Sequence, residues 1–266
     1  MSRLFPIASG SSGNCTYIGS GSSGILIDVG ISAKAVTTAL NTASIAPESI
    51  RGIFVTHSHI DHISGLRVFA DLYGIPVFAS NKTAATLDND PAHRPKDIHI
   101  IYDTVSVGDF LINRFDTSHD CAGSGGYTVT LQNGDKCGVC TDLGVVTDSV
   151  RRAITGCNAL LFESNHDVTM LQNGGYPEHL KRRILGDTGH LSNVSCSKEL
   201  THLVENGTSR IVLGHLSREN NDPRIAKSTA TSALMDSGMR ENEDYLLFVA
   251  PTKNGKMIIL KKKKKI

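Results

Sequence analysis

The chain has 266 residues, 39% hydrophobic and 20% charged, a composition typical of a globular protein with a sizeable core. It has no apolar run of 18 residues and no N-terminal stretch typical of a signal peptide, so we expect a cytoplasmic protein without a membrane segment. The net charge is +1, but five lysines occupy 261–265, and without them 22 basic residues face 26 acidic ones, a net charge of −4. This lysine run is either a solvated end or a source of non-specific affinity for nucleic acid.

Short β-branched runs separated by glycine-rich turns predict strands throughout the chain. In the first half we expect strands at 4–8, 15–18, 25–29, 52–57 and 75–79, and helices at 33–40, 63–73 and 81–87. In the second half we expect strands at 98–102, 110–115, 127–132, 136–141, 158–164, 209–215, 245–250 and 257–260, and helices at 145–154, 176–185, 192–206 and 223–236.

Strands precede helices twice along the chain, without strict strand–helix–strand repetition. This order favours an α+β protein in which two sheets pack face to face with helices outside. We expect a single domain over 1–260 and a basic C-terminal tail at 261–266. A lone C-x-x-C, Cys137 and Cys140, falls within a predicted strand and is interpreted as a pair of buried thiols.

Ligand-type residues follow four of the predicted strands. Asp28, His57, Asp142 and His215 each come directly after an apolar run. Strand ends lie at the edge of a sheet, where a rigid scaffold can direct their side chains. Four such instances predict one convergent site.

The segment "THSHIDH" (56–62) has the geometry of a metal site. His57 and His59 face the same way in extended backbone and can bind one cation. Asp61 and His62, at the start of the next helix, can bind a second cation nearby. His119 can complete the first set, His215 can complete the second, and Asp142 can bridge because a carboxylate has two oxygens.

The segment "THSHIDHISG", followed by His119, Asp142 and His215, resembles the H-x-H-x-D-H signature of the metallo-β-lactamase superfamily. The resemblance extends to the YycJ (WalJ) group of bacterial phosphodiesterases, similar to DNA exonucleases, and spans nearly the whole chain. The segments that carry it are "ASGSSGN" (8–14), "ESNHD" (163–167), "GHLSN" (189–193) and "GHLSRENN" (214–221).

This resemblance implies a four-layer αββα sandwich with two divalent ions between the sheets. The first ion would be bound by His57, His59 and His119, the second by Asp61, His62 and His215, with Asp142 bridging. Asp28 would orient ligands from behind. The nitrogen and oxygen donors favour Zn²⁺ or Mn²⁺, with Fe possible.

By analogy with tRNA-processing phosphodiesterases of the superfamily, His190 would be the general acid and Glu163 its orienting partner. His166 competes with His190 for this role. Asp61 would help to orient or deprotonate the attacking water. Candidate substrate-binding residues are Ser11, Ser12, Asn14, Asn193, Arg218, Asn220 and Asn221. The alternatives are a hairpin turn for 8–14 and a polar turn for 218–221.

The first functional hypothesis is therefore a dinuclear-metal phosphodiesterase acting on nucleic acid. The resemblance implies a 5′-to-3′ DNA exonuclease in which a metal-bound hydroxide attacks the scissile phosphate. The alternative is a small-molecule hydrolase for a thioester or cyclic phosphodiester, which the acidic body of the chain favours. A non-catalytic nucleic-acid-binding module is the third possibility, and the full ligand set argues against it.

Overall fold

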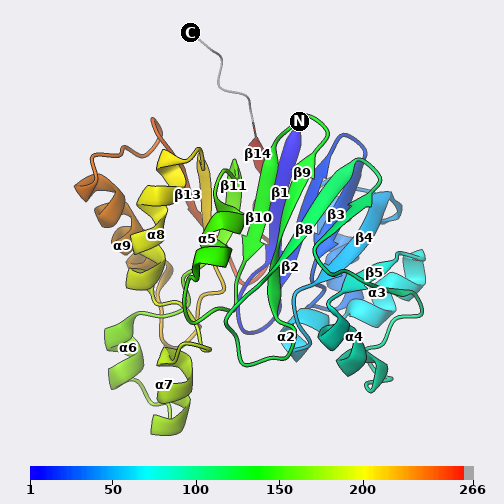
Figure 1. Ribbon diagram of the computed structural model, residues 1–266, viewed down its shortest axis with the longest axis horizontal. Coiled ribbons are helices and arrows are strands. Elements are labelled where there is room, and N and C mark those ends of the chain that lie inside the picture. Colours follow the sequence, from blue (N-terminus) through cyan, green and yellow to red (C-terminus); the bar gives the residue numbers. More distant parts are fainter. Residues whose placement is uncertain (261–266) are drawn as a thin grey trace.

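Two seven-stranded sheets lie face to face, and helices cover the outer side of each (Figure 1). The structure is a computed structural model that describes residues 1–260, so the expected tail at 261–266 lies outside the described residues. The first sheet has the order β14-β1-β2-β3-β4-β5-β6 and the second the order β13-β12-β11-β10-β9-β8-β7.

The strands of the first sheet are β1 (Ser2–Ala8), β2 (Cys15–Ser20), β3 (Ser23–Ile27), β4 (Ile50–Val55), β5 (Val77–Ala79), β6 (Ile98–Ile100) and β14 (Ile258–Leu260). Those of the second are β7 (Thr104–Val107), β8 (Phe110–Asp116), β9 (Gly125–Leu131), β10 (Lys136–Cys140), β11 (Ala159–Glu163), β12 (Arg210–Gly214) and β13 (Leu246–Val249). The α-helices are α1 (Ala33–Thr42), α2 (Ile60–Ile63), α3 (Leu66–Tyr73), α4 (Asn81–Asp88), α5 (Asp148–Ile154), α6 (Val168–Asn173), α7 (Glu178–Leu185), α8 (Asn193–Glu205) and α9 (Pro223–Asp236). A 3₁₀ turn spans Pro47–Ser49.

Alternating side chains divide the core into three layers. Ile53 and Val55 of β4 pack under α1, α3 and α4, whereas Phe54 between them faces the second sheet. In the second sheet, Leu161 of β11 faces the first sheet, and its neighbour Phe162 packs under α5, α8 and α9. Successive strand residues point to opposite faces. The fold predicted from the sequence, an αββα sandwich, is confirmed.

Three local features differ from the sequence-based predictions. The helix expected over 63–73 is interrupted at Gly65, whose N–H bonds to Val29 O and where a Cβ would lie 2.0 Å from Ile31 O. The short edge strand β7 and helix α6 were not predicted. Helix α6 has a recognisable start, because the Asp167 side chain accepts from Met170 N at its N-cap.

The buried thiols were predicted correctly. Cys137 and Cys140 lie in β10 with fully buried side chains, and burial raises the pKa of both thiols. No helix within residues 1–260 has the length and apolar character needed to cross a bilayer.

Candidate metal centre

The four strands that end in a ligand-type residue end at one edge of the sandwich. Asp28 follows β3 directly and His57 follows β4 by two residues, and these strands are parallel. Asp142 follows β10 by two residues and His215 follows β12 directly; both strands run parallel to β11 between them. Because carboxyl ends of parallel strands meet at the same edge, the four side chains converge.

The loop before β2 holds the α2 segment against this edge. Asn14 N donates to Asp61 O at 2.8 Å, and Gly30 N donates to Asn14 O at 2.7 Å. A Cβ on Gly30 would lie 1.6 Å from Asp61 O, so only glycine permits this approach. The Asn14 amide nitrogen also lies 3.0 Å from His62 Nε2 and 3.3 Å from Asp61 Oδ2.

Three histidines form the first ligand group, called the A group: His57, His59 and His119. His59 Nδ1 lies 3.0 Å from His57 Nε2 and 3.4 Å from His119 Nε2. His119 Nδ1 lies 3.2 Å from Gly189 O, and a carbonyl only accepts, so Nδ1 carries the proton and Nε2 turns its lone pair inward. Three ring nitrogens thus converge on one point.

The second ligand group, called the B group, consists of Asp61, His62 and His215. Asp61 Oδ2 lies 3.5 Å from His62 Nε2 and 3.6 Å from His215 Nε2. Behind them, His62 Nδ1 donates to Asp28 at 2.8 Å and His215 Nδ1 donates to Glu163 at 2.7 Å. Carboxylates in this position fix the imidazole tautomer and orient the ligand nitrogen.

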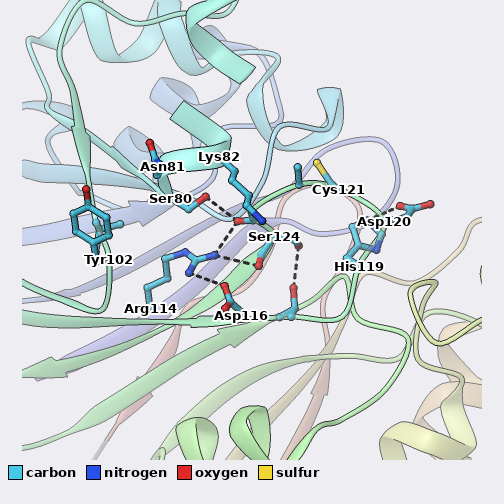
Figure 2. Close-up of a pocket in the computed structure, with 14 residues that line it drawn as sticks. Ser80, Asn81, Lys82, Tyr102, Arg114, Asp116, His119, Asp120, Cys121 and Ser124 are labelled. Atoms are coloured by element: carbon cyan, nitrogen blue, oxygen red, sulfur yellow. Dashed lines mark hydrogen bonds and ion pairs between the residues drawn. The ribbon is translucent and has the colours of Figure 1, made fainter. Parts of the chain in front are cut away.

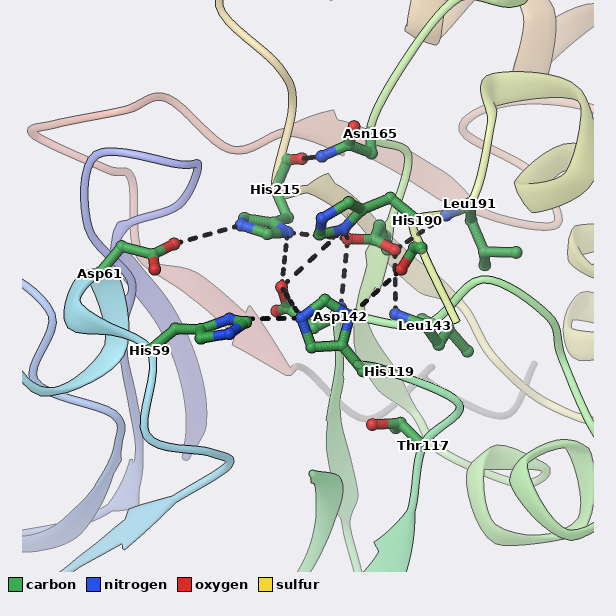
Figure 3. A network of polar contacts seen from close by, with 12 residues as sticks. His59, Asp61, Thr117, His119, Asp142, Leu143, Asn165, His190, Leu191 and His215 are labelled. Atoms are coloured by element: carbon green, nitrogen blue, oxygen red, sulfur yellow. Dashed lines mark hydrogen bonds and ion pairs between the residues drawn. The ribbon is translucent and has the colours of Figure 1, made fainter. Parts of the chain in front are cut away.

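Asp142 lies between the two groups (Figure 3). Its Oδ2 is 3.4 Å from His62 Nε2 of the B group, and its Oδ1 is 3.8 Å from His119 Nε2 of the A group. The seven residues expected as ligands are therefore assembled around one carboxylate.

The two groups differ in protonation. Burial and the surrounding histidines lower the pKa of His57 well below its usual value, and burial with His119 lowers that of His59. Burial opposes charge on His62, but Asp142 and Asp28 outweigh it and raise the pKa of His62 to about 9. The pKa of His215 is also raised, because Asp142, Asp61 and Glu163 outweigh its burial. These shifts favour neutral imidazoles at His57 and His59 and favour protons on His62 and His215, which a bound cation would replace.

The donor set fits a divalent cation in each group. Asp142 Oδ2 and His215 Nε2 are buried and have no hydrogen-bond partner among the described residues. Buried polar atoms are normally paired, so two such atoms facing other ligand atoms fit the binding of a cation between them. The donors are nitrogen and oxygen only, as Zn²⁺, Mn²⁺ or Fe accept.

Comparisons with known proteins place this arrangement in a family. Residues 8–215 match the model of the metallo-β-lactamase superfamily. The chain belongs to this superfamily. It is 37% identical over 242 residues to a protein of Bacillus anthracis called exodeoxyribonuclease YycJ, an alignment covering 90% of this chain and 91% of the relative. It is 35% identical over 248 residues to exodeoxyribonuclease WalJ of Streptococcus pneumoniae, covering 91% of each.

Solved structures of the same fold have far lower sequence identity. YhfI of Bacillus subtilis, a metallo-β-lactamase fold protein, superposes with a TM-score of 0.70 at 14% identity, over 97% of this chain and all of that one. Zn²⁺-bound PqqB of Methylobacterium extorquens superposes with a TM-score of 0.71 at 16% identity, over 98% of this chain and all of that one. At this identity the likeness establishes the metallo-β-lactamase fold alone.

Glu163 is the hub of the polar network beside the two candidate ligand groups of this superfamily member. Its fully buried carboxylate accepts from His190 Nδ1 at 3.0 Å and from His215 Nδ1, and also from the backbone N–H of Asp142, Leu143 and Leu191. Glu163 is therefore a positioning residue for both histidines. Burial opposes its charge, yet the two histidines hold the pKa of Glu163 well below its usual value.

His190 lies in the site and His166 does not. The His190 ring centroid is 5.1 Å from that of His119 and 5.3 Å from that of His215 (Figure 3). Burial opposes charge on His190, but Glu163 outweighs it and raises the pKa of His190. The His166 ring is buried, neither of its nitrogens has a hydrogen-bond partner within residues 1–260, and burial lowers its pKa to about 4. The geometry favours His190 over His166 as a proton donor.

The residues expected to bind substrate divide into two sets. Ser11, Ser12 and Arg218 are exposed in loops, with side chains available to a ligand. Asn14, Asn193, Asn220 and Asn221 are buried, which revises that expectation. The amides of Asn193 and Asn221 bond to each other and to Ser164, and Asn14 holds Asp61 and His62. Asn14, Asn193 and Asn221 therefore hold neighbouring residues of the site in place by hydrogen bonds. Asn220 is also buried, and its amide nitrogen has no hydrogen-bond partner among the described residues.

Sequence reasoning missed two supports of the ligands. Thr56 Oγ1 lies 2.8 Å from Asp28, to which it donates, and 3.1 Å from His57 Nδ1, so it connects the A group to the carboxylate behind the B group. The position of Thr56 directly before His57 could have indicated that its hydroxyl supports this ligand. The Gly189 carbonyl behind His119 had no signal, since backbone acceptors depend on the path of the loop.

Proposed function

We propose that this protein is a dinuclear-metal phosphodiesterase that hydrolyses DNA, acting as a 5′-to-3′ exonuclease. The observation that supports it most is the pair of ligand groups meeting at Asp142, in a chain 37% identical to a protein called an exodeoxyribonuclease. The A group would hold one ion, the B group the other, and Asp142 would contact both. We favour Zn²⁺ or Mn²⁺, with Fe possible. Two such ions, when bound, activate water and stabilise charge on the phosphate oxygens.

The side chains around the ions supply orientation and proton transfer. Asp61 would contribute Oδ2 to the B group, and its carboxylate would help to orient the attacking water by accepting a hydrogen bond from it. His190 donates Nδ1–H to Glu163, which leaves Nε2–H as the ring donor available to a substrate. Its raised pKa favours the protonated form, which can protonate the leaving oxygen as a general acid.

Two further assignments concern the domain organisation and the location of the protein. Residues 1–260 would act as one domain, because a single core cluster joins both sheets. A DNA substrate, together with six cysteines that are all unpaired, favours a cytoplasmic location.

The activity is tested with purified protein loaded with Mn²⁺ or Zn²⁺. Substrates are 5′- and 3′-labelled single- and double-stranded DNA and RNA, with a thioester and bis(p-nitrophenyl) phosphate as controls. We expect stepwise release of nucleotides from the 5′ end of DNA. Hydrolysis of the thioester alone would contradict the proposal and support the small-molecule hydrolase, which the net charge of −4 outside the lysine run favours.

The acid role of His190 has a separate readout. His190→Ala should lower the rate on DNA about 10²–10⁴-fold. The loss on bis(p-nitrophenyl) phosphate should be much smaller, because its leaving group needs no proton. His166→Ala, with circular dichroism to verify folding, is the matched control and should leave the ratio of the two rates unchanged. Equal losses on both substrates in His190→Ala would contradict the acid role.

A further inference from the structure

A cavity of about 560 Å³ lies directly beside the A group. Its wall comes from the start of α4, the segment after β6, strand β8 and the loop 117–124 that carries His119. Figure 2 shows Tyr102 at one end and His119 at the other, with Lys82 and Arg114 between them. The volume falls within the range of about 300–1,000 Å³ that small-ligand pockets occupy. His119 belongs to both, but its side chain is only 1% exposed, so an occupant of the cavity would lie against the loop that carries this A-group residue.

The aromatic end of the cavity is open. The Tyr102 side chain is 72% exposed, and within residues 1–260 its ring stacks on no other ring and its hydroxyl has no hydrogen-bond partner. An exposed aromatic face in a substrate cavity is the usual platform for an unpaired nucleic-acid base, since every base has a π-face. A base pair inside a duplex cannot use it, because both of its faces are already stacked.

Among the described residues that line the cavity, Lys82 is a cation available to a ligand. The Arg114 guanidinium is buried and already donates to Gly123 O and Ser124 O while pairing with Asp116 at 2.8 Å. Asp120 pairs with Arg183. Lys82, by contrast, is exposed, and its ammonium has no hydrogen-bond or ion-pair partner in the described part of the chain. A phosphate beside the base would meet this charge.

We propose that this cavity binds an unpaired nucleotide of the DNA substrate, with its base on Tyr102 and its phosphate at Lys82, next to the phosphodiester at the metal centre. The inference rests on the proposed nuclease function and adds that the enzyme needs a single-stranded segment at this position. Arg114 does not contact the nucleotide in this proposal. Its role is to hold the loop that carries His119, through its hydrogen bonds to Gly123 O and Ser124 O.

The absence of tryptophan in the chain provides a direct probe. In Tyr102→Trp the new indole is the only one, so its fluorescence reports stacking at this position. Titration with oligothymidylate in EDTA, without any metal, should give saturable quenching. Met235→Trp, at an exposed position in α9 outside this cavity, is the matched control and should show none.

Kinetics on the metal-loaded enzyme test the same contacts. Tyr102→Ala should raise KM for single-stranded DNA about 10-fold relative to KM for bis(p-nitrophenyl) phosphate, and Tyr102→Phe should restore it. Lys82→Gln should weaken binding and reduce the slope of log K against log salt by about one. Lys198→Gln, an exposed lysine of α8 outside the cavity, should keep the slope.

The outcomes separate this inference from the proposed function. Oligonucleotide binding without quenching in Tyr102→Trp, or equal quenching by a blunt duplex, would overturn the nucleotide site even if the enzyme degrades DNA. Absence of DNA hydrolysis by the wild-type enzyme would instead overturn the nuclease function. Quenching by single strands alone, with the KM change in Tyr102→Ala, would support the site.

Discussion

The A and B groups contain similar ligands but are supported in different ways. In the A group, the outer nitrogens of His57 and His119 contact neutral acceptors, the Thr56 hydroxyl and the Gly189 carbonyl. In the B group, the outer nitrogens of His62 and His215 contact the buried carboxylates of Asp28 and Glu163. The comparison shows that buried carboxylates orient His62 and His215, whereas a neutral hydroxyl and a loop carbonyl orient His57 and His119.

This difference assigns different sensitivities to the two halves. Replacing a buried carboxylate with a neutral group leaves the charge of the histidine that it contacts uncompensated, which is costly. A backbone carbonyl that moves can be replaced by water, which is a small loss. We therefore expect the B group to be disrupted by single isosteric changes that remove charge, and the A group mainly by changes in loop geometry.

The largest effect is expected from Glu163→Gln. The Glu163 carboxylate accepts hydrogen bonds from His190, His215 and three backbone N–H groups. In the variant an amide N–H would face some of these donors and the negative charge would be lost, so the free energy of unfolding should fall by about 3 kcal/mol or more. Urea denaturation measures it. Glu199→Gln is the control, because Glu199 pairs with Arg151 near the surface and its loss should cost about 1 kcal/mol or less. Similar losses in the two variants would contradict the role of Glu163 as the hub.

An intermediate effect is expected from Asp28→Asn. Removing the carboxylate behind His62 should weaken one of two metal equivalents about 10- to 100-fold, as measured by calorimetric titration with Zn²⁺. The same change in a His59→Ala background, which disables the A group, identifies the affected ion. If the weakened equivalent disappears with His59→Ala, the assignment of Asp28 to the B group is wrong.

The smallest effect is expected from Gly189→Ala. A Cβ there would lie 2.2 Å from Ile184 O, so the segment must move and its carbonyl must shift from His119. We expect a loss of less than about 10-fold in affinity for the A-group ion, because water can replace the carbonyl. Gly175→Ala is the control, since a Cβ there meets nothing within 4 Å. A larger loss than in Asp28→Asn would reverse the comparison.

The sequence predicted the parts of the site that depend on strand ends. Asp28, His57, Asp142 and His215 follow apolar runs, and the parallel register brings such positions to one edge regardless of loop detail. The interior amides were harder to assign. Asn193 and Asn221 look like substrate contacts in the sequence because polar residues beside ligands suggest a rim, yet they bond to each other 28 residues apart.

The fold was predictable for the same reason, and its exceptions are local. Apolar periodicity defines strands that are buried on both faces, such as β4 and β11. It does not reveal β7, whose residues are only partly buried at a sheet edge, or the break at Gly65, which depends on contact with a distant loop.

The backbone of Asp28, Asp142 and His215 shows how strongly the ligand network constrains these positions. All three have φ between 55° and 60°, a left-handed conformation that costs a side-chain-bearing residue of order 1–3 kcal/mol. Replacement by glycine would relieve that strain, but at Asp28 and Asp142 it would also remove the carboxylates that offset the charge of the buried histidines. The chain therefore keeps side chains at three positions where the backbone alone favours glycine.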